Sequence, residues 1–508
     1  MKTRHCHHPL RAALLGLLIA LVAGCGAGGV GDIASGGIGG TGITSGTVTG
    51  FGSVIVNARI HETDNSTQFL RNGNASTQDA FRVGDVVRID WDGNQDDLTR
   101  NAVRVVYQRA LQGEVTGAPE PAAGTVEVVG QTVAVDATTL FEEFTSPAPT
   151  GENFPQDLDV GACVEISGLR DTTGNLLATR IERIAPPCAD QTELQGVITS
   201  PVGDLPTRIT VSGTTVDLPA GIAIDPTPVA LTTGAFVTVR GSYDNGVLTA
   251  SMIRVPTDEF IDRDDDEADI EGLISALSRN GSTARFTVSG ISVSATDAIE
   301  YENGSFADLA DDVRIEVEGV FVSGVLVAEE IEFKRDDQVE MESILLSADA
   351  DNERLTLDFG PDGTVVVTTD VLITRFKNDT DTPGLTLADL REGDYVKIVG
   401  SVADPLGDTE PVATLVELEG LAGSGDDDVE DRVLQGPVTD VTDSPDSFSV
   451  LGVMISSAGL EECEGAGDET LDCGVLVESL SPGDIVEVQG TSSVAGGWID
   501  WEELELED

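Results

Sequence analysis

The sequence predicts an all-β protein organised as a tandem array of about six small five-stranded barrels. Two observations lead to this fold class. A strand-like phrase, made of a turn glycine, two apolar residues two positions apart and a closing glycine, returns six times along the 508 residues, and two of the six copies lack one of the glycines. A second phrase, typically Leu-Gln-Gly, opens each interval, and its copies stand 67 to 93 residues apart. Fixed end motifs at irregular spacing indicate a small domain with loop insertions and argue against a short-period solenoid.

The strand-like phrase is predicted to be the core strand of each unit. Its clearest copy is 483–490, and the others span 84–91, 161–168, 234–241, 312–319 and 393–400. Side chains alternate across a strand, so the apolar pair should face inward and its polar neighbours outward. The predicted inward pairs are Val87/Ile89, Val164/Ile166, Val237/Val239, Ile315/Val317, Val396/Ile398 and Val486/Val488. The predicted outward residues include Thr238, Glu316, Lys397 and Glu487. An aspartate in place of one inward valine is expected to unfold that unit and leave its neighbours largely intact.

The fourth unit shows the internal plan of a repeat most clearly. Alternation of apolar and polar residues predicts five strands, over 270–277, 284–289, 291–295, 313–321 and 325–333. Turn residues separate the hairpin strands. The longer connector between the third and fourth strands carries only a short helix-like patch. Such a unit resembles an OB-like barrel whose helix is reduced.

The N-terminus is predicted to be a targeting segment. Basic residues precede an apolar run over 12–23, which is too short to span a bilayer. The run ends in Val22-Ala23-Gly24-Cys25, which resembles the lipobox of bacterial lipoproteins. That resemblance implies acylation of Cys25, and Gly26 in place of an aspartate implies sorting to the outer membrane. An ordinary signal peptide with a nearby cysteine is the alternative.

The repeats and the composition between them divide the chain into ten segments. These are a signal peptide (1–24), a Gly-rich tether (25–43), unit 1 (44–110), unit 2 (111–190), unit 3 (191–257), an acidic linker (258–269), unit 4 (270–335), unit 5 (336–420), a second acidic linker (421–432) and unit 6 (433–508).

The chain is strongly acidic, with 90 Asp and Glu against 28 Lys and Arg and a net charge of −62. Such a surface disfavours nucleic acid and anionic lipid and favours diffuse binding of divalent cations. The acidic linkers supply candidate calcium ligands, namely Asp264, Asp265, Asp266, Asp426, Asp427 and Asp428. Neither run has the ligand spacing or interior glycine of an EF-hand loop, so solvated linkers are the favoured interpretation.

Four cysteines follow Cys25. Cys463 and Cys473 bracket a short acidic loop and are expected to form a disulfide in an oxidising envelope. Cys163 and Cys188 lie in the second unit, and their pairing is a further possibility. A zinc site is a poor alternative because the sequence has no CxxC spacing and His61 is the sole histidine beyond the signal peptide.

Several glycine-rich motifs together resemble a known family. The stretch 36–43, the following Gly50-Phe-Gly-Ser-Val-Ile-Val-Asn57, the GDxVxVxG phrases and closing strands such as 246–254 are similar to bacterial lipoproteins with tandem DUF5666 domains. The resemblance covers nearly all of residues 36–508, and units 1 and 5 depart from it most. It implies the repeated domain and the lipoprotein context, but no activity and no cofactor.

An enzyme is the function class that the sequence supports least. No nucleophile elbow or P-loop occurs, and His61 is expected to be an exposed structural residue. A pair of glycosidase carboxylates stays open among so many acidic residues. Trp91, Trp498 and Trp501 are candidate sugar platforms or simple packing residues.

The expected function is therefore a non-enzymatic cell-envelope lipoprotein that acts as a structural or scaffolding array. The alternatives are a glycan- or protein-binding outer-membrane lipoprotein and a calcium-dependent adhesive or matrix component. The expected partners are the membrane, through the lipid anchor, and a protein or glycan. The sequence leaves open whether the array faces the periplasm or the cell surface.

Overall fold

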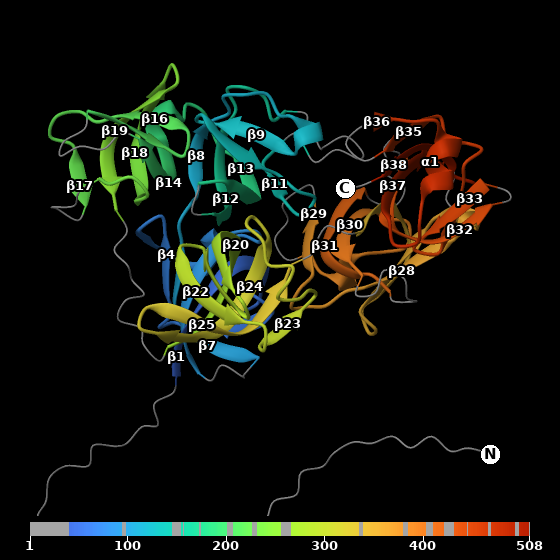
Figure 1. The fold of residues 1–508 in the computed structure, drawn as a ribbon, viewed down its shortest axis with the longest axis horizontal. Coiled ribbons are helices and arrows are strands. Elements are labelled where there is room, and N and C mark those ends of the chain that lie inside the picture. The colour runs from blue at the N-terminus through green and yellow to red at the C-terminus, as the bar shows by residue number, and fades with distance from the viewer. Residues whose placement is uncertain are drawn as a thin grey trace, which may run out of the picture. The chain divides into compact units, whose positions relative to one another are not determined.

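The computed structural model describes residues 40–93, 98–144, 154–155, 157–171, 174–200, 207–225, 231–255, 266–334, 339–378, 385–402, 410–420, 431–443, 446–465, 469–492 and 497–506. Figure 1 shows these residues as β-strands connected by turns and loops, with one short α-helix. Within the described residues, no helix has the length and apolar character needed to cross a membrane. The predicted signal peptide and Cys25 lie outside them.

The elements follow one another in the six intervals that the repeats define, except that β1, β20 and β32 begin two to four residues before the predicted start of their units. Unit 1 has β1 (Gly40–Phe51), β2 (Val54–Val56), β3 (Arg59–Glu62), β4 (Gln68–Arg71), β5 (Asn74–Ser76), η1 (Gln78–Ala80), β6 (Val86–Gly93) and β7 (Thr99–Tyr107). Unit 2 has β8 (Leu111–Glu114), η2 (Pro121–Ala123), β9 (Thr125–Val128), β10 (Gln131–Ala134), β11 (Leu140–Glu142), β12 (Cys163–Arg170), β13 (Leu176–Arg183) and η3 (Ala189–Gln191). Unit 3 has β14 (Thr192–Ser200), β15 (Arg208–Val211), β16 (Thr214–Asp217), β17 (Ala223–Asp225), β18 (Phe236–Asp244) and β19 (Val247–Arg254).

The second half of the chain continues the pattern. Unit 4 has β20 (Glu267–Asn280), β21 (Thr283–Val288), β22 (Ile291–Thr296), β23 (Glu300–Glu302), β24 (Arg314–Val322) and β25 (Val325–Phe333). Unit 5 has β26 (Val339–Asp349), β27 (Arg354–Asp358), η4 (Gly360–Asp362), β28 (Thr364–Thr368), β29 (Arg375–Asn378), η5 (Leu387–Asp389), β30 (Tyr395–Ser401) and β31 (Val412–Gly420). Unit 6 has β32 (Asp431–Asp443), β33 (Asp446–Val450), β34 (Val453–Ser456), β35 (Glu462–Gly465), β36 (Glu469–Thr470), α1 (Cys473–Ser479), β37 (Ile485–Thr491) and β38 (Asp500–Leu506).

Strand pairing closes units 1 to 5 into five-stranded rings. In unit 4 the ring runs β20–β21–β22–β25–β24 and back to β20, with β22 and β25 parallel. Units 1, 3 and 5 close in the same order. In unit 2 a bridge between Val115 and Val128 completes the ring. In unit 6 the described strands pair from β34 through β33, β32, β37 and β38 to β35, without a pairing of β34 to β38. The five-stranded OB-like plan is therefore observed.

The recurring phrase forms β6, β12, β18, β24, β30 and β37. All twelve predicted inward residues are at most 1% exposed, so that prediction is confirmed. Where the phrase opens with glycine, that residue has a left-handed φ, as at Gly483 with +99°. The closing glycine stands at a β-bulge, as at Gly319, where an added Cβ would lie 2.1 Å from the carbonyl oxygen of Val327. The closing glycine is thus required by close backbone approach.

The units are joined in pairs through their sheets. β1 of unit 1 pairs in parallel with β20 of unit 4. β8 of unit 2 pairs with β14 of unit 3, and β26 of unit 5 pairs with β32 of unit 6. Units 5 and 6 share one hydrophobic core, and so do units 2 and 3. Units 1 and 4 keep separate cores, apart from Ile43 of β1, which packs into the core of unit 4.

The predicted outward residues differ from the expectation of a solvated face. Thr238, Glu316 and Lys397 are less than 9% exposed, and only Glu487 is intermediate. The period-two alternation is correct, but the outer face is covered. Buried polar and charged side chains there satisfy one another by ion pairs and hydrogen bonds, as buried charges require.

Candidate functional site

Two rows of carboxylates cross the outer face of unit 4. The strand register places Asp269 on β20 opposite Glu318 on β24, and Glu318 opposite Glu330 on β25. Glu330 in turn lies opposite Glu300 on β23. The second row, two residues further along each strand, consists of Glu271, Glu316, Glu332 and Glu302. Eight carboxylates therefore occupy neighbouring positions of four adjacent strands.

Four basic side chains compensate part of this charge. Arg59 of unit 1 contacts Glu318 at 2.7 Å, and Arg100 of unit 1 lies 3.5 Å from Asp269. These two contacts connect unit 1 to the carboxylates of unit 4.

The other two cations come from unit 4 itself. Arg314 lies 2.6 Å from Glu271, and Lys334 lies 2.6 Å from Glu316 and 2.7 Å from Glu332. The acidic groups thus outnumber their basic partners two to one.

Burial and mutual repulsion change the acidity of several of these groups. Burial, together with the charges of Glu316 and Glu318, raises the pKa of Asp269 well above its usual value. Burial and neighbouring glutamates, Glu318 first among them, raise the pKa of Glu330 to about 6. Burial also raises the pKa of Glu332. The pKa of Glu271 is lowered, because Arg314 and Lys334 outweigh the effect of its burial.

Three of the carboxylates are close enough to share a cation. Ligand oxygens of Asp269, Glu316 and Glu318 all lie within 4.8 Å of one another. Oxygen ligands of this kind suit calcium or magnesium. Each of the three nevertheless has its own basic partner, so the cluster is already compensated without a metal ion.

These carboxylates were not predicted to form a site, although the sequence contains a signal for them. Each of the four strands carries two acidic residues separated by one residue, which puts both on the same face. They are Asp269-Ile-Glu271, Glu300-Tyr-Glu302, Glu316-Val-Glu318 and Glu330-Ile-Glu332.

The structure describes one of the six calcium candidates of the acidic linkers. Asp264, Asp265, Asp426, Asp427 and Asp428 lie outside the described residues. Asp266 is described, and its carbonyl oxygen accepts a hydrogen bond from the backbone of Phe321 at 3.0 Å.

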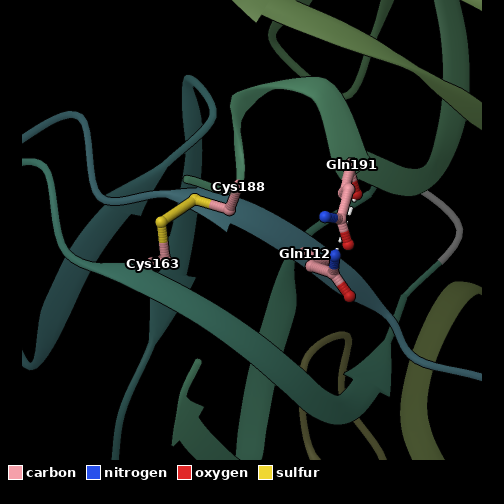
Figure 2. The surroundings of a disulfide bond; sticks show 4 residues. All are labelled: Gln112, Cys163, Cys188 and Gln191. Atoms are coloured by element: carbon pink, nitrogen blue, oxygen red, sulfur yellow. Dashed lines mark hydrogen bonds between the residues drawn. A yellow bond between two sulfur atoms is a disulfide. The ribbon is translucent and has the colours of Figure 1, made fainter. Parts of the chain in front are cut away.

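Both pairs of cysteines that were singled out form disulfides in the structure. Cys163 and Cys188 are joined, with 5.8 Å between their Cα atoms, and Cys463 and Cys473 with 5.2 Å. Figure 2 shows the first bond tying the start of β12 to the turn that leads into unit 3. Beside it, the side-chain amide of Gln112 donates to the carbonyl oxygen of Gln191 at 2.9 Å. The disulfide therefore fixes the passage between two paired units.

The expectation of an exposed His61 is wrong. The side chain is fully buried, and its Nε2 lies 3.0 Å from the hydroxyl of Thr44. Burial and the nearby Arg100 lower the pKa of His61 to about 3. The hairpin β2–β3 places this residue beside β1, the strand that pairs with unit 4. The periodicity of the sequence does not indicate that this position is buried.

The three tryptophans have different surroundings. Trp91 and Trp501 are buried, while Trp498 is 74% exposed. The guanidinium of Arg100 lies 4.3 Å from the ring centre of Trp91, and Trp501 stacks on Phe359. Packing is therefore the role of Trp91 and Trp501, and only Trp498 presents its ring to solvent.

Comparison with known proteins supports the repeats but adds no activity. The search of curated proteins finds no match. Among solved structures, drosophila Unr CSD456 is similar at 14% sequence identity and a TM-score of 0.14, with 42% of this chain and 97% of that chain covered.

The family comparison is more specific. A domain of unknown function, DUF5666, matches residues 112–182, 195–254, 271–332 and 435–499. The matches number four, in units 2, 3, 4 and 6, which corrects the expectation of about six family repeats. Unit 1 has Trp91 at the closing-glycine position, and unit 5 has Ser343 where the other units have the glycine of the opening phrase. The matched segments cover about half of the 508 residues, and the chain belongs to the DUF5666 family.

Proposed function

We propose that this chain is a non-enzymatic scaffold of the bacterial cell envelope, attached to the outer membrane by a lipid on Cys25. The observation that carries the proposal is the joining of its units two by two through strand pairing. A joint made of main-chain hydrogen bonds restricts how two barrels can move against each other. Units built in this way suit a load-transmitting or spacing role better than a set of independent binding modules.

Buried ion pairs also connect units that do not share a sheet. Arg71 of unit 1 lies 2.8 Å from Asp85 of the same unit and 2.9 Å from Glu165 of unit 2. The hydroxyl of Tyr107 donates to Glu165 at 3.0 Å, and Arg180 of unit 2 donates to Asp85 at 3.0 Å. Buried ion pairs add little net stability but penalise wrong arrangements. Such contacts support a defined architecture, which a scaffold needs.

The surroundings of His61 favour a non-catalytic role. A general base must be reachable by its substrate and have a pKa near the working pH. His61 is fully buried, and its pKa is about 3. It is also the only histidine that would remain after removal of the predicted signal peptide.

A crosslinking pull-down from native envelopes tests the scaffold proposal. We expect the full chain to retain a defined envelope partner, and purified protein to leave ester, glycoside and peptide substrates unchanged. Reproducible turnover of any of these substrates by wild type, lost on mutation of surface carboxylates, would contradict the proposal.

The anchoring part of the proposal has its own test. Metabolic labelling with a fatty-acid analogue should tag wild type and not Cys25→Ala, and wild type alone should fractionate with outer membranes. Label retained by Cys25→Ala would show that the lipid, if any, is attached elsewhere.

A further inference from the structure

A cavity of about 600 Å³ with both polar and apolar walls lies where units 1, 4 and 5 meet. Its walls come from β1, β20, β24 and β25 on one side and from unit 5 on the other. The hydroxyl of Thr49 donates to the carbonyl oxygen of Leu372 at 3.0 Å and so connects the two sides. The volume falls in the range of about 300–1,000 Å³ that is typical of small-molecule sites.

One buried hydroxyl of this cavity has no hydrogen-bond partner among the described residues. Thr47 is 4% exposed and lines the cavity, and its Oγ1 makes no hydrogen bond. Its backbone N–H, in contrast, donates to Glu271 at 2.6 Å. A buried hydroxyl left unsatisfied has lost its hydrogen bonds to water, and a hydrogen-bonding ligand would restore them.

Two acids of the cavity are already paired with two of its bases, and a third base, the buried Arg375, lines the cavity as well. Arg314 lies 2.6 Å from Glu271, and Lys334 lies 2.7 Å from Glu332. An anionic ligand would therefore have to compete with these carboxylates, and a cationic ligand with the two bases. A neutral ligand could accept hydrogen bonds from the bases and donate to the acids while both ion pairs stay intact.

The unit 5 side of the cavity adds an apolar wall. Leu372, Ile373, Val402 and Val412 line it. A pyranose ring combines hydroxyls around its edge with an apolar C–H face, so it would satisfy both sides of the cavity at once. A hydrocarbon ligand would instead displace water from the ion pairs without replacing the hydrogen bonds that the water makes.

The rim of the cavity contains a strained turn. Asn57 and Ala58 have φ of +52° and +51° in the hairpin between β2 and β3, and both line the cavity. In units 2, 3, 4 and 6 the second residue of this turn is a glycine, namely Gly130, Gly213, Gly290 and Gly452. An alanine at a left-handed position costs stability. Strain of this kind is a recognised feature of ligand-binding positions.

We propose that this cavity binds a neutral saccharide of one or two rings. The hydroxyl of Thr47 and the two ion pairs recognise its hydroxyls, and the valine and leucine side chains of unit 5 cover its apolar face. This role goes beyond the scaffold proposal and does not depend on it, because the cavity is part of the folded chain whether or not an envelope partner exists.

Calorimetric titration of the full chain with cellobiose, maltose and N,N′-diacetylchitobiose tests the proposal. We expect at least one of the three to bind in the micromolar to millimolar range. Thr47→Val removes the hydroxyl at nearly constant volume and should weaken binding about tenfold. Ser401→Phe places a ring in the cavity and should abolish binding. Thr238→Val, a buried threonine of unit 3, serves as the matched control and should bind as wild type does.

Thermal melting of each variant separates loss of binding from loss of folding. Both cavity variants should melt within a few degrees of wild type. If Ser401→Phe melts early, the decision rests on Thr47→Val. Absence of binding by all three sugars, binding that both cavity variants retain, or tighter binding of inorganic phosphate at the same cavity would overturn the proposal.

Discussion

Units 4 and 5 use the same backbone register to arrange charge in opposite ways. In unit 5 one row across the outer face reads Glu342, Lys397, Glu417 and Lys377, with the sign alternating at each strand. The matching row of unit 4 reads Glu271, Glu316, Glu332 and Glu302, with no alternation. One unit thus neutralises its outer face within the row. The other depends on cations from outside the row and keeps an excess of negative charge.

The comparison teaches that the fold tolerates either arrangement, provided that the inward residues are kept. Lys397 forms ion pairs with Glu340 and with Glu342, and Lys377 lies 3.0 Å from Glu417. These pairs lie within unit 5. The carboxylates of unit 4 take two partners from unit 1, Arg59 and Arg100. Charge in unit 4 is therefore coupled to its joint with unit 1.

The largest expected effect comes from breaking the core of either unit. Val317→Asp in unit 4 and Ile398→Asp in unit 5 each bury a charge at a position with 0% exposure. We expect each change to cost more than about 4 kcal/mol and to unfold its own unit. The two variants should differ in how far unfolding spreads to the neighbouring unit. Units 5 and 6 share a hydrophobic core, whereas among the described residues Ile43 is the one residue of unit 1 in the core of unit 4.

Hydrogen exchange followed by mass spectrometry can measure how far unfolding spreads. Ile398→Asp should lose protection in both β30 and β37, which revises the expectation that one unit unfolds alone. Val317→Asp should lose protection in β24 and β1 while β7 of unit 1 stays protected. An equal loss of exchange protection across units 1 and 4 would show that the two cores unfold together.

The next effect comes from removing a cation from each face. Lys397→Met leaves Glu340 and Glu342 without their base, and Lys334→Met does the same to Glu316 and Glu332. Each loss should cost about 3–5 kcal/mol near neutral pH, with the greater loss in unit 5, where Lys397 is the more buried. Urea unfolding measures both values. Arg208→Met, which breaks an exposed pair with Asp217, is the control and should leave the free energy of unfolding nearly unchanged.

The acidic rows should make unit 4 respond to pH. The pKa of Glu330 is raised to about 6, so the folded state binds more protons than the unfolded state between the ordinary glutamate value and that point. The contribution of Glu330 is therefore fully present at low pH and is lost as pH rises through about 6. Since Glu330 is partly exposed, screening limits the effect to about 1 kcal/mol.

Glu330→Gln should remove this dependence and protect unit 4 at pH 7 and above, as measured by exchange in β24 and β25. Glu417→Gln in unit 5 is the matched change. It should lower stability instead, because it removes the partner of Lys377. A Glu330→Gln variant as pH-sensitive as wild type would show that this carboxyl does not set the response.

The sequence was enough to predict the five-stranded barrel, but it did not predict how the barrels pair with one another. Alternation specified which residues of 483–490 and its five relatives face inward, because core packing fixes side-chain polarity. Alternation could not show that Glu316 and Lys397 are buried. A charged residue on the outer face is expected to be exposed to solvent unless its ion-pair partner is known. The pairing of β1 with β20 joins residues more than 200 positions apart, and no local pattern encodes it.

The candidate site was predictable only in part. The spacing Glu316-Val-Glu318 and its three relatives puts the acids on one face, and this could have been derived from the sequence. Which strands lie next to one another depended on ring closure. Asn57 and Ala58 reach the cavity only because β1 joins unit 4, so their role required the structure.

The smallest expected effect, and the one most specific to the comparison, is that of salt. Added sodium chloride screens repulsion among the like charges of unit 4 and attraction between the alternating charges of unit 5. We expect exchange protection to rise slightly in β24 and β25 and to fall slightly in β30 and β31, each by a few tenths of a kcal/mol. Calcium chloride at the same ionic strength provides the control. A much larger rise in β24 with calcium would identify a cation bound at Asp269, Glu316 and Glu318, whereas equal responses leave the rows as a diffuse charge. Salt should therefore change exchange protection in opposite directions in units 4 and 5, because the charges along the row are alike in unit 4 and alternate in unit 5.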